Sequence, residues 1–265
     1  MNRILVWDLP TRVFHWLLTA AFVGALGIAL VADDDSSLFQ IHMLLGLIAT
    51  FLVILRVIWG IVGTRYARFG SFIFGPGELF SYMRGVFRRA GERHVGHNPG
   101  SAYAIYAMLL LSLGLAVSGV LLPARKSLEE PHEIMAYLMA LAVGAHVAGL
   151  VWHTIRHREN IALSMIDGKK VGEASAALAS SRPLAGLVLL TLSAGWAFLV
   201  FEGHDAQRRQ LTLFGQTIRL GEIKQEKTRE SGRDGDHGRA RHRGQHRDHG
   251  DHHRGHGDHH EIDGD

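Results

Sequence analysis

Three histidines interrupt a long apolar run, Pro131 to His153, that reads PHEIMAYLMALAVGAHVAGLVWH. A helix advances about 100° and 1.5 Å per residue, so the 14 residues from His132 to His146 cover nearly four turns and about 21 Å. These two imidazoles therefore share one face at two depths, while His153 falls near the far end of the run. A polar side chain inside a membrane is costly and usually faces the interior of a helix bundle, so each imidazole needs a partner from another helix.

Two earlier apolar runs begin with histidines that supply such partners. Because successive runs cross a membrane in opposite directions, His42 lies at the level of His132 and His15 at the level of His146. Imidazole pairs at two depths are what a di-haem electron carrier requires, since each b-type haem iron takes two axial nitrogens. The other ring N–H groups are expected to be fixed by carbonyls. Interfacial histidines with a structural hydrogen bond are the alternative.

Two arginines extend this pattern. Arg56 follows His42 by 14 residues and so lies on the same face of the second run, at the depth of His15 and His146. No Asp or Glu within the apolar runs reaches that depth, and a haem propionate is the expected partner of the guanidinium. Arg12, one turn before His15, is placed to bind a propionate in the same way.

The elements that must position these residues are five apolar runs of about 18 to 24 residues, each long enough to span a bilayer. They are Val13–Ala32, Ile41–Val62, Ala102–Leu122, Pro131–His153 and Leu184–Phe201. Charged residues lie between the runs and in the C-terminal region, which is typical of an integral membrane protein with a polar tail. A signal peptide is the alternative for the first run, although no clear A-x-A site precedes Asp33.

We expect an all-α integral membrane protein with three parts. Residues 1–170 form a four-helix transmembrane haem-binding bundle, residues 171–203 a fifth transmembrane helix and its linker, and residues 204–265 a polar tail. The tail has nine histidines from His237 to His260 among Asp, Arg and Gly, and this composition predicts disorder. Weak metal binding and a merely solvated tail remain alternatives. At its start, QLTLFGQTIRLG predicts a small hairpin.

The chain has no cysteine. This excludes disulfides, iron–sulfur ligation by thiolates and covalent attachment of a c-type haem. A redox centre must therefore use nitrogen or oxygen ligands.

Lys and Arg near the ends of the runs are distributed unequally, which predicts the orientation. Only Arg125 and Lys126 lie on one side, whereas thirteen lie on the side of the N-terminus. These are Arg3, Arg12, Arg65, Arg68, Arg84, Arg88, Arg89, Arg93, Arg156, Arg158, Lys169, Lys170 and Arg182. By the positive-inside rule the N-terminus is cytoplasmic, and the tail lies outside if the fifth run spans.

Between the second and third runs, GPGELFSYMRGVFRRAG predicts a short amphipathic helix at the membrane surface. It is followed by GHNPG, in which His97 is expected either to contact a propionate or quinone or to make a loop hydrogen bond. The tryptophans near the run ends are expected to anchor the chain at the membrane interface. They are Trp7, Trp16, Trp59 and Trp152.

Five stretches together resemble the bacterial cytochrome b561 family, which is related to the cytochrome b subunits of nickel-iron hydrogenases and formate dehydrogenases. They are VWDLPTRVFHW, HMLLG, RVIWGIVGTRYARF, GHNPG and HRENIALSMIDGKK, within residues 3–170. The resemblance implies two non-covalent b haems in a bacterial inner-membrane bundle, with His15, His42, His132 and His146 as axial ligands. It also implies electron transfer between quinones and a periplasmic cytochrome or a dehydrogenase or hydrogenase subunit. The fifth run and the tail lie outside the shared pattern.

We interpret the chain as a di-haem b-type cytochrome that passes electrons between the quinone pool and a redox partner in a respiratory chain. It is an electron carrier, and an enzyme only if quinone-linked oxidoreductase activity is counted. A divalent-metal transporter is an alternative, but it needs midplane carboxylates, and Glu133 is the only acidic residue in the runs. A haem-binding sensor or assembly subunit is a third. Membrane lipid is an expected partner, nucleic acid is not, and a homodimer is left open.

Overall fold

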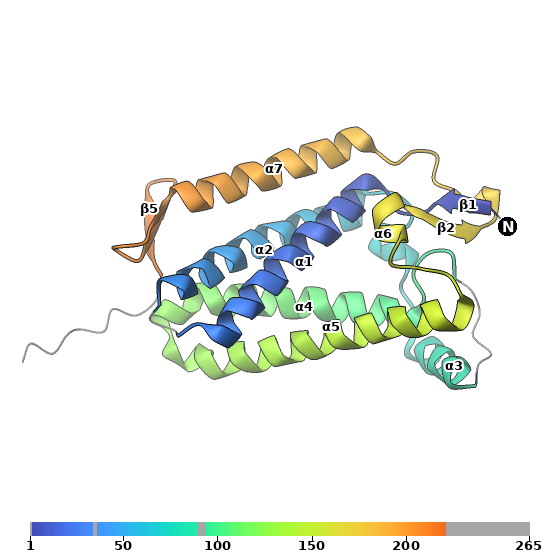
Figure 1. Cartoon of the computed structure of the whole chain (residues 1–265), viewed down its shortest axis with the longest axis horizontal. Helices are drawn as coiled ribbons and strands as arrows, with labels where there is room; N and C mark the ends of the chain where they lie inside the picture. Colours follow the sequence, from blue (N-terminus) through green and yellow to red (C-terminus); the bar gives the residue numbers. More distant parts are fainter. Residues whose placement is uncertain (1, 34–35, 89–93, 221–265) are drawn as a thin grey trace, which may run out of the picture. The chain divides into compact units, whose positions relative to one another are not determined.

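The computed structural model describes residues 2–33, 36–88 and 94–220. Its described part contains five helices long and apolar enough to span a membrane. They are α1 (Leu9–Val31), α2 (Ser37–Val62), α4 (Pro99–Leu121), α5 (Glu129–His157) and α7 (Pro183–Glu202) (Figure 1). All five predicted runs are therefore confirmed as helices, and the all-α membrane architecture is confirmed with them.

Polar caps begin three of these helices. The side chain of Asp8 accepts a hydrogen bond from the Thr11 N–H at the start of α1, and Ser36 and Asn98 cap α2 and α4 in the same way. Each cap satisfies a backbone N–H that the first helical turn leaves unpaired. The caps thus define where each apolar run begins.

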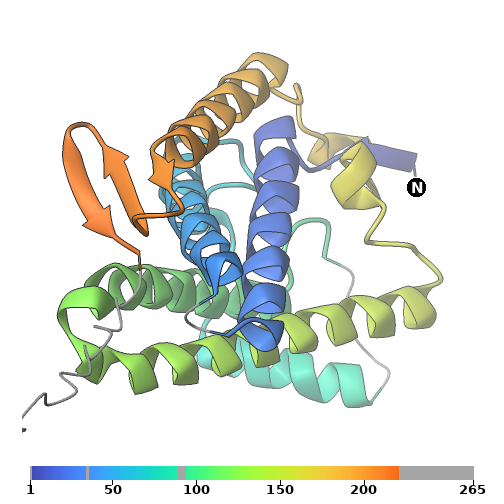
Figure 2. The same cartoon turned by 60° about the vertical axis from the view of Figure 1, so that its left-hand side comes forward.

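The spanning helices form two groups. Helices α1 and α2 pack closely together with α7 against both, while α4 and α5 form a second pair that joins the first group through α2 (Figures 1 and 2). Buried Phe14, Ala21, Leu52 and Leu189 form a core where α1, α2 and α7 meet. Within the described ranges, α5 makes no comparable contact with α1 or α2.

Short elements cover the end of the bundle where α1 begins, which we call the Asp8 end. Strand β1 (Asn2–Leu5) pairs antiparallel with β2 (Lys169–Gly172), so that Asn2 lies opposite Gly172. The one-turn helix α6 (Ser164–Asp167) precedes β2, and Arg3 and Asp167 form a 2.7 Å ion pair. The N-terminus is thus joined to the segment that follows α5. Elsewhere along the described chain, four short 3-10 turns connect longer elements: Phe69–Ser71, Leu122–Ala124, Lys126–Leu128 and Ala174–Ala176.

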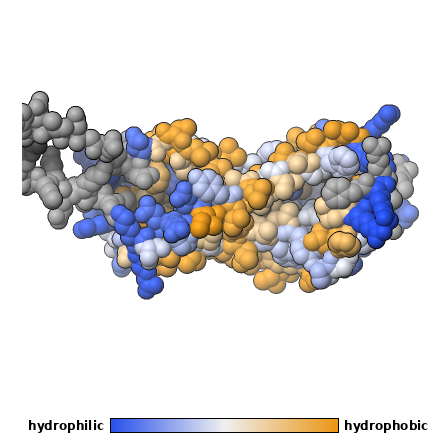
Figure 3. Space-filling model, turned by 90° about the horizontal axis from the view of Figure 1, so that it is seen from below, coloured by the Kyte–Doolittle hydropathy of each residue, from blue (hydrophilic) through white to orange (hydrophobic). Residues whose placement is uncertain are grey.

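Helix α3 (Pro76–Phe87), at the Asp8 end, is the amphipathic helix that the sequence predicts. Phe80 and Met83 are 71% and 40% exposed. Figure 3 shows hydrophobic residues over the middle of the visible face and hydrophilic residues toward its two ends. Membrane anchoring by α3 remains a prediction.

A small antiparallel sheet lies at the other end, which we call the Asp33 end. It consists of β3 (His204–Asp205), β4 (Gln210–Leu213) and β5 (Gln216–Arg219), so the predicted hairpin is confirmed. Leu211 and Leu220 are buried with Leu44 of α2 and Val200 of α7. The segment expected as a polar tail therefore begins with a packed sheet. Its nine histidines lie outside the described residues.

Candidate functional site

His42 of α2 and His132 of α5 face each other near the Asp33 end. Their ring centroids are 6.4 Å apart and the rings are inclined by 77°. His42 Nδ1 lies 2.8 Å from the Ala25 carbonyl oxygen, and His132 Nδ1 lies 2.8 Å from the Ser118 hydroxyl oxygen. The structure thus brings together the pair that the sequence places at this depth.

These hydrogen bonds assign the tautomer of each ring. The Ala25 carbonyl can only accept, so His42 Nδ1 carries its hydrogen. The Ser118 hydroxyl donates to the Gly114 carbonyl at 2.8 Å, so its oxygen is available to accept from His132 Nδ1–H. Both imidazoles therefore present the lone pair of Nε2, which is the arrangement that a metal-ligating histidine requires.

The separation of the two rings suits a shared metal. A ring nitrogen binds a metal at about 2 Å and lies about 1 Å from its ring centroid, so imidazoles on opposite sides of one metal have centroids about 6 Å apart. The observed 6.4 Å agrees with this value. A Cβ added at Gly119 would lie 3.3 Å from His132 Cε1, so a larger residue there would press on this ring.

His15 of α1 and His146 of α5, the second predicted pair, lie toward the Asp8 end. They lie close enough for their charges to interact. In the part of the chain that the structure describes, His15 Nδ1 is buried and has no hydrogen-bond partner. A buried polar atom without a partner calls for an explanation such as an absent ligand.

Arg56 lies near this second pair and is only 5% exposed. Its guanidinium carbon lies 6.0 Å from the centroid of the Phe14 ring and 5.0 Å from that of Phe69, and its Nη1 has no hydrogen-bond partner among the described residues. A buried cation is strongly disfavoured unless an anion compensates it. A ligand that brings negative charge, as a haem propionate would, could therefore pair with this guanidinium.

Asp8 is a buried carboxylate that the sequence analysis missed, because it lies just outside the first apolar run. It is 1% exposed and accepts hydrogen bonds from Trp59 Nε1, the Thr64 hydroxyl and the Thr11 N–H. It interacts electrostatically with Arg56, but the described residues contain no ion pair between the two. The available signal was its place as a capping residue two positions before Pro10.

Arg12 is partly engaged by the protein itself. Its Nη1 donates to the Ile166 carbonyl of α6, which ties α1 to the segment after α5, while its Nε is buried with no partner in the described ranges. Only part of this guanidinium is therefore open to the predicted propionate.

His97 fills the space beside Arg56. Its ring lies 4.7 Å from that of Trp7 and 4.4 Å from that of Phe72. Burial, and then the positive charges of Arg56 and Lys170, lower the pKa of His97 to about 3, so its imidazole is neutral at physiological pH. Trp7 is 4% exposed, so its prediction as an interfacial anchor is wrong. It is part of the core beneath this loop.

Lys170 holds the loop that carries His97. Its Nζ donates to the His94 carbonyl at 3.1 Å and to the Gly96 carbonyl at 3.2 Å, and lies 5.9 Å from the Trp7 ring. Burial lowers the pKa of Lys170 to about 8. The sequence places this lysine only among the charges that set the orientation.

Among the histidines of the described ranges, His42 and His132 have their rings in contact with each other. Within those ranges, no group of three or more His, Asp or Glu side chains could hold a metal ion. The facing imidazoles of His42 and His132 would suit a haem iron better than a small hydrated cation.

Comparison with known proteins identifies the class of this site. The profile of the prokaryotic cytochrome b561 family matches residues 6–168. The chain belongs to this family. It is therefore a multi-pass membrane protein of a b-type cytochrome family. All four histidines, Arg12 and Arg56 lie inside the matched range, whereas α7 and the sheet lie outside it.

Two relatives in the family carry related names. The probable Ni/Fe-hydrogenase 1 B-type cytochrome subunit of Escherichia coli K12 is 25% identical over an alignment of 146 residues, with 46% of this chain and 61% of the relative covered. The probable Ni/Fe-hydrogenase B-type cytochrome subunit of Rhizobium leguminosarum bv. viciae is 24% identical over an alignment of 215 residues, with 64% of this chain and 90% of the relative covered. The chain thus spans less than two thirds of the E. coli protein. No solved structure matches it significantly.

Proposed function

We propose that the chain carries electrons across the bacterial inner membrane, between the quinone pool and a redox partner, through two b-type haems. The observation that carries this proposal is the facing pair His42 and His132, with both Nδ1 atoms bonded and a centroid separation suited to one iron. Bound haem supplies reversible one-electron chemistry, and the protein supplies ligands, spacing and electrostatics.

Each pair would hold one haem. His42 and His132 would ligate the iron at the Asp33 end, and His15 and His146 the iron at the Asp8 end. Helix α5 would supply one ligand to each, and the 14 residues between His132 and His146 would space the two sites by about 21 Å. This spacing would put one electron-carrying site in each half of the bilayer.

The arginines would balance the carboxylates of the second haem. Arg56 has an unpartnered Nη1 and Arg12 an unpartnered Nε, both buried toward the Asp8 end. Charge-assisted hydrogen bonds from a guanidinium to a propionate would satisfy these atoms. Arg56 would also favour the reduced haem, because reduction adds a negative charge.

The partner is proposed from the relatives' names and from the family. Both named relatives are described as cytochrome subunits of Ni/Fe-hydrogenases. We therefore place a hydrogenase-type subunit first and a periplasmic cytochrome second as the redox partner, with the N-terminus in the cytoplasm. Family membership favours this function over the divalent-metal transporter that the sequence left as an alternative.

Absorption spectra of the purified protein, oxidised in air and then reduced with dithionite, test the haem assignment. With haem quantified per chain, the wild type is expected to show two low-spin b haems. His132→Ala and His146→Ala are each expected to lose one, and a different one, because each removes a ligand from a different pair. His153→Ala, on the same helix but in neither pair, is the matched control and should keep both. A protein without haem after adequate haem supply, or one spectrum for both ligand variants, would contradict the proposal.

A separate assay tests whether a quinol exchanges electrons with the haems. Addition of a membrane-soluble quinol to the oxidised wild type is expected to produce the reduced b-haem spectrum. Two correctly bound haems that no quinol reduces, and that no quinone oxidises once they are reduced, would retain the cytochrome and remove the quinone from the proposal.

A further inference from the structure

The turn between β4 and β5 has an unusual residue at its tip. Phe214 and Gly215 have φ angles of 51° and 77°, as in a type I′ turn, where Asn or Asp normally precedes Gly. The left-handed conformation is unfavourable for a bulky side chain, and the Phe214 side chain is 81% exposed. An exposed aromatic residue in a strained turn suggests an apolar partner that the described chain does not supply.

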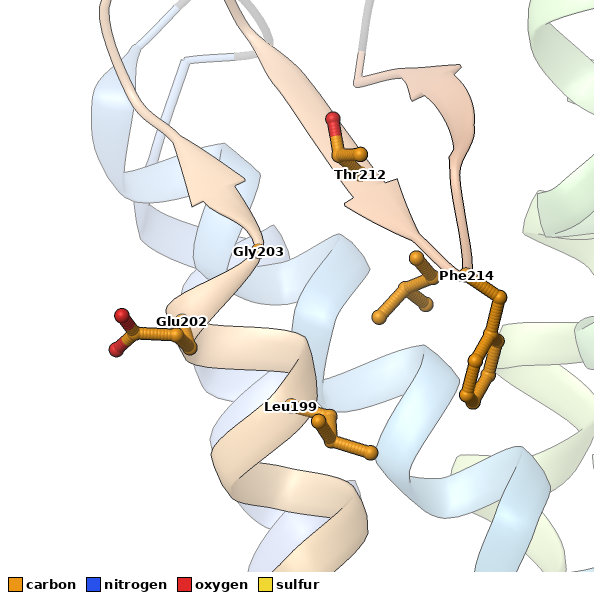
Figure 4. A pocket seen from close by; sticks show the side chains of 6 residues that line it. Leu199, Glu202, Gly203, Thr212 and Phe214 are labelled. Carbon is orange, nitrogen blue, oxygen red and sulfur yellow. The ribbon is translucent and has the colours of Figure 1, made fainter.

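A hollow lies beside this tip. It has a volume of about 180 Å³ and is lined by Leu199, Glu202, Gly203, Thr212, Leu213 and Phe214. Figure 4 shows the Leu199 side chain of α7 pointing toward the hairpin turn that carries Phe214, and the Glu202 carboxylate pointing the other way. Its wall is therefore largely apolar.

The length of α7 places this hollow at membrane depth. With 20 residues, α7 is about 30 Å long, which is the thickness of the hydrocarbon core, so every turn is needed to span it. Leu199 lies three residues before the end of the helix, about 4.5 Å from it. Phe198 and Phe201, in the same turn, are 65% and 47% exposed. Phe214 lines the same hollow as Leu199 and must lie at a similar depth.

The hairpin is fixed in this position. The Gln40 side chain of α2 donates to the Ala206 carbonyl at 3.3 Å, and its Oε1 lies 2.8 Å from His204 Nε2. Leu211 is fully buried against the helices. A Cβ at Gly203 would lie 2.3 Å from the Thr212 carbonyl oxygen, so this glycine permits the close approach of β4 to the end of α7.

We propose that the hairpin tip is inserted into the bilayer at the Asp33 end, and that the hollow between Phe214 and α7 holds an acyl chain of a membrane lipid. A lipid chain is the proposed occupant because Leu199, which lines the hollow, lies beside the exposed Phe198 and Phe201 on a helix long and apolar enough to span a membrane. Phe214 would cover the chain as an interfacial aromatic residue. The hairpin lies outside the family match, so this proposal is independent of the haem ligands.

Site-directed spin labelling tests the insertion, because the chain has no cysteine of its own. Phe214→Cys in the full-length haem-loaded protein, reconstituted in phospholipid vesicles, is expected to be accessible to oxygen and protected from a water-soluble nickel chelate. Gln207→Cys, on an exposed loop of the same sheet, is the matched control and should show the reverse. Leu199→Cys gives a second depth measurement if the first variant does not fold. A tip accessible to the nickel chelate, or shielded from both reagents by another protein copy, would overturn the proposal.

Native mass spectrometry tests the occupant. Leu199→Trp should fill the hollow and reduce phospholipid retained per chain by one relative to the wild type, with an unchanged haem spectrum as the measure of correct folding. Retention of the same number of lipids by a correctly folded variant would rule out the acyl chain. Because haem content is read in the same sample, failure of this proposal is distinguishable from failure of the haem assignment.

Discussion

At the scale of single residues, the proposed haem site depends on groups that bind the histidines rather than the haem itself. Ala25 and Ser118 each engage the Nδ1 atom of one histidine and so leave Nε2 available. At the other end of the bundle, Arg56 and His15 have buried nitrogens without partners in the described part of the chain. The protein itself thus orients His42 and His132, whereas His15 Nδ1 and Arg56 Nη1 have no such partner among the described residues.

Ser118→Ala is expected to weaken binding of the haem at the Asp33 end. It removes the hydrogen-bond acceptor of His132 Nδ1–H, and loss of such a partner typically costs about 10- to 100-fold in metal affinity. The measurement is the rate of haem loss to a high-affinity apoprotein acceptor. Ser118→Thr, which keeps the hydroxyl, should behave like the wild type. Equal haem loss from all three proteins would show that Ser118 has no role in orienting His132.

Arg56→Met is expected to lower the midpoint potential of the haem at the Asp8 end. Removal of a buried cation disfavours the reduced state, and the shift should be roughly 60 mV or more, which is a tenfold change in a one-electron equilibrium constant. Arg56→Lys should recover part of the shift. Redox titration resolves both haems, and the other haem serves as the internal control. An equal shift in both potentials would indicate a general change of structure.

The buried imidazole of His97 is expected to make the free energy of unfolding sensitive to acid. Its folded-state pKa of about 3 lies below the ordinary 6.5, so the unfolded chain binds the proton first as the pH falls. The contribution is complete above pH 6.5 and is lost between about pH 6.5 and 3. His97→Gln cannot be protonated and should lose less stability over this range, by on the order of a few kcal/mol. Thermal unfolding in detergent at several pH values measures the difference. Parallel curves for both proteins would remove His97 as the cause.

At the scale of elements, the capping residue of α1 also joins two helices. Asp8 caps α1 and accepts hydrogen bonds from Trp59 of α2 and from Thr64 just beyond it. The start of α1 and the end of α2 are thereby held together at the level of Arg56. This contact explains why a residue outside the membrane run is almost completely buried.

Asp8→Ala is therefore expected to destabilise the bundle strongly. Loss of the cap costs about 1 kcal/mol, and each buried donor left without an acceptor costs about 1 to 3 kcal/mol more. The unfolding temperature in detergent should fall by several degrees. Asp8→Asn, which keeps an acceptor oxygen, should lose less, and Glu173→Ala, at an exposed position, should lose almost nothing. A loss in the Glu173 variant as large as that in Asp8→Ala would contradict this account.

At the scale of the whole molecule, five spans place the ends of the helical region on opposite sides of a membrane. The excess of Lys and Arg at the Asp8 end predicts that this end faces the cytoplasm. Single cysteines test the orientation in intact cells with a membrane-impermeant maleimide. Ser37→Cys, at the Asp33 end, is expected to react, and Ser71→Cys, at the Asp8 end, only after lysis. The reverse pattern would invert the topology and exchange the sides of the two haem sites.

The sequence by itself determined the five apolar helices, the pairing of His42 with His132 and the hairpin, because helix length, period and turn chemistry are local properties of the chain. Contacts between distant segments depended on how the helices pack. The bonds of Asp8 to Trp59 and Thr64, the hold of Lys170 on the His97 loop and the burial of Trp7 belong to this class. An apolar or charged residue near a run end reads the same in sequence whether it faces lipid, water or a neighbouring helix. Only the tertiary structure decides between these environments, because it sets the rotation and contacts of each helix.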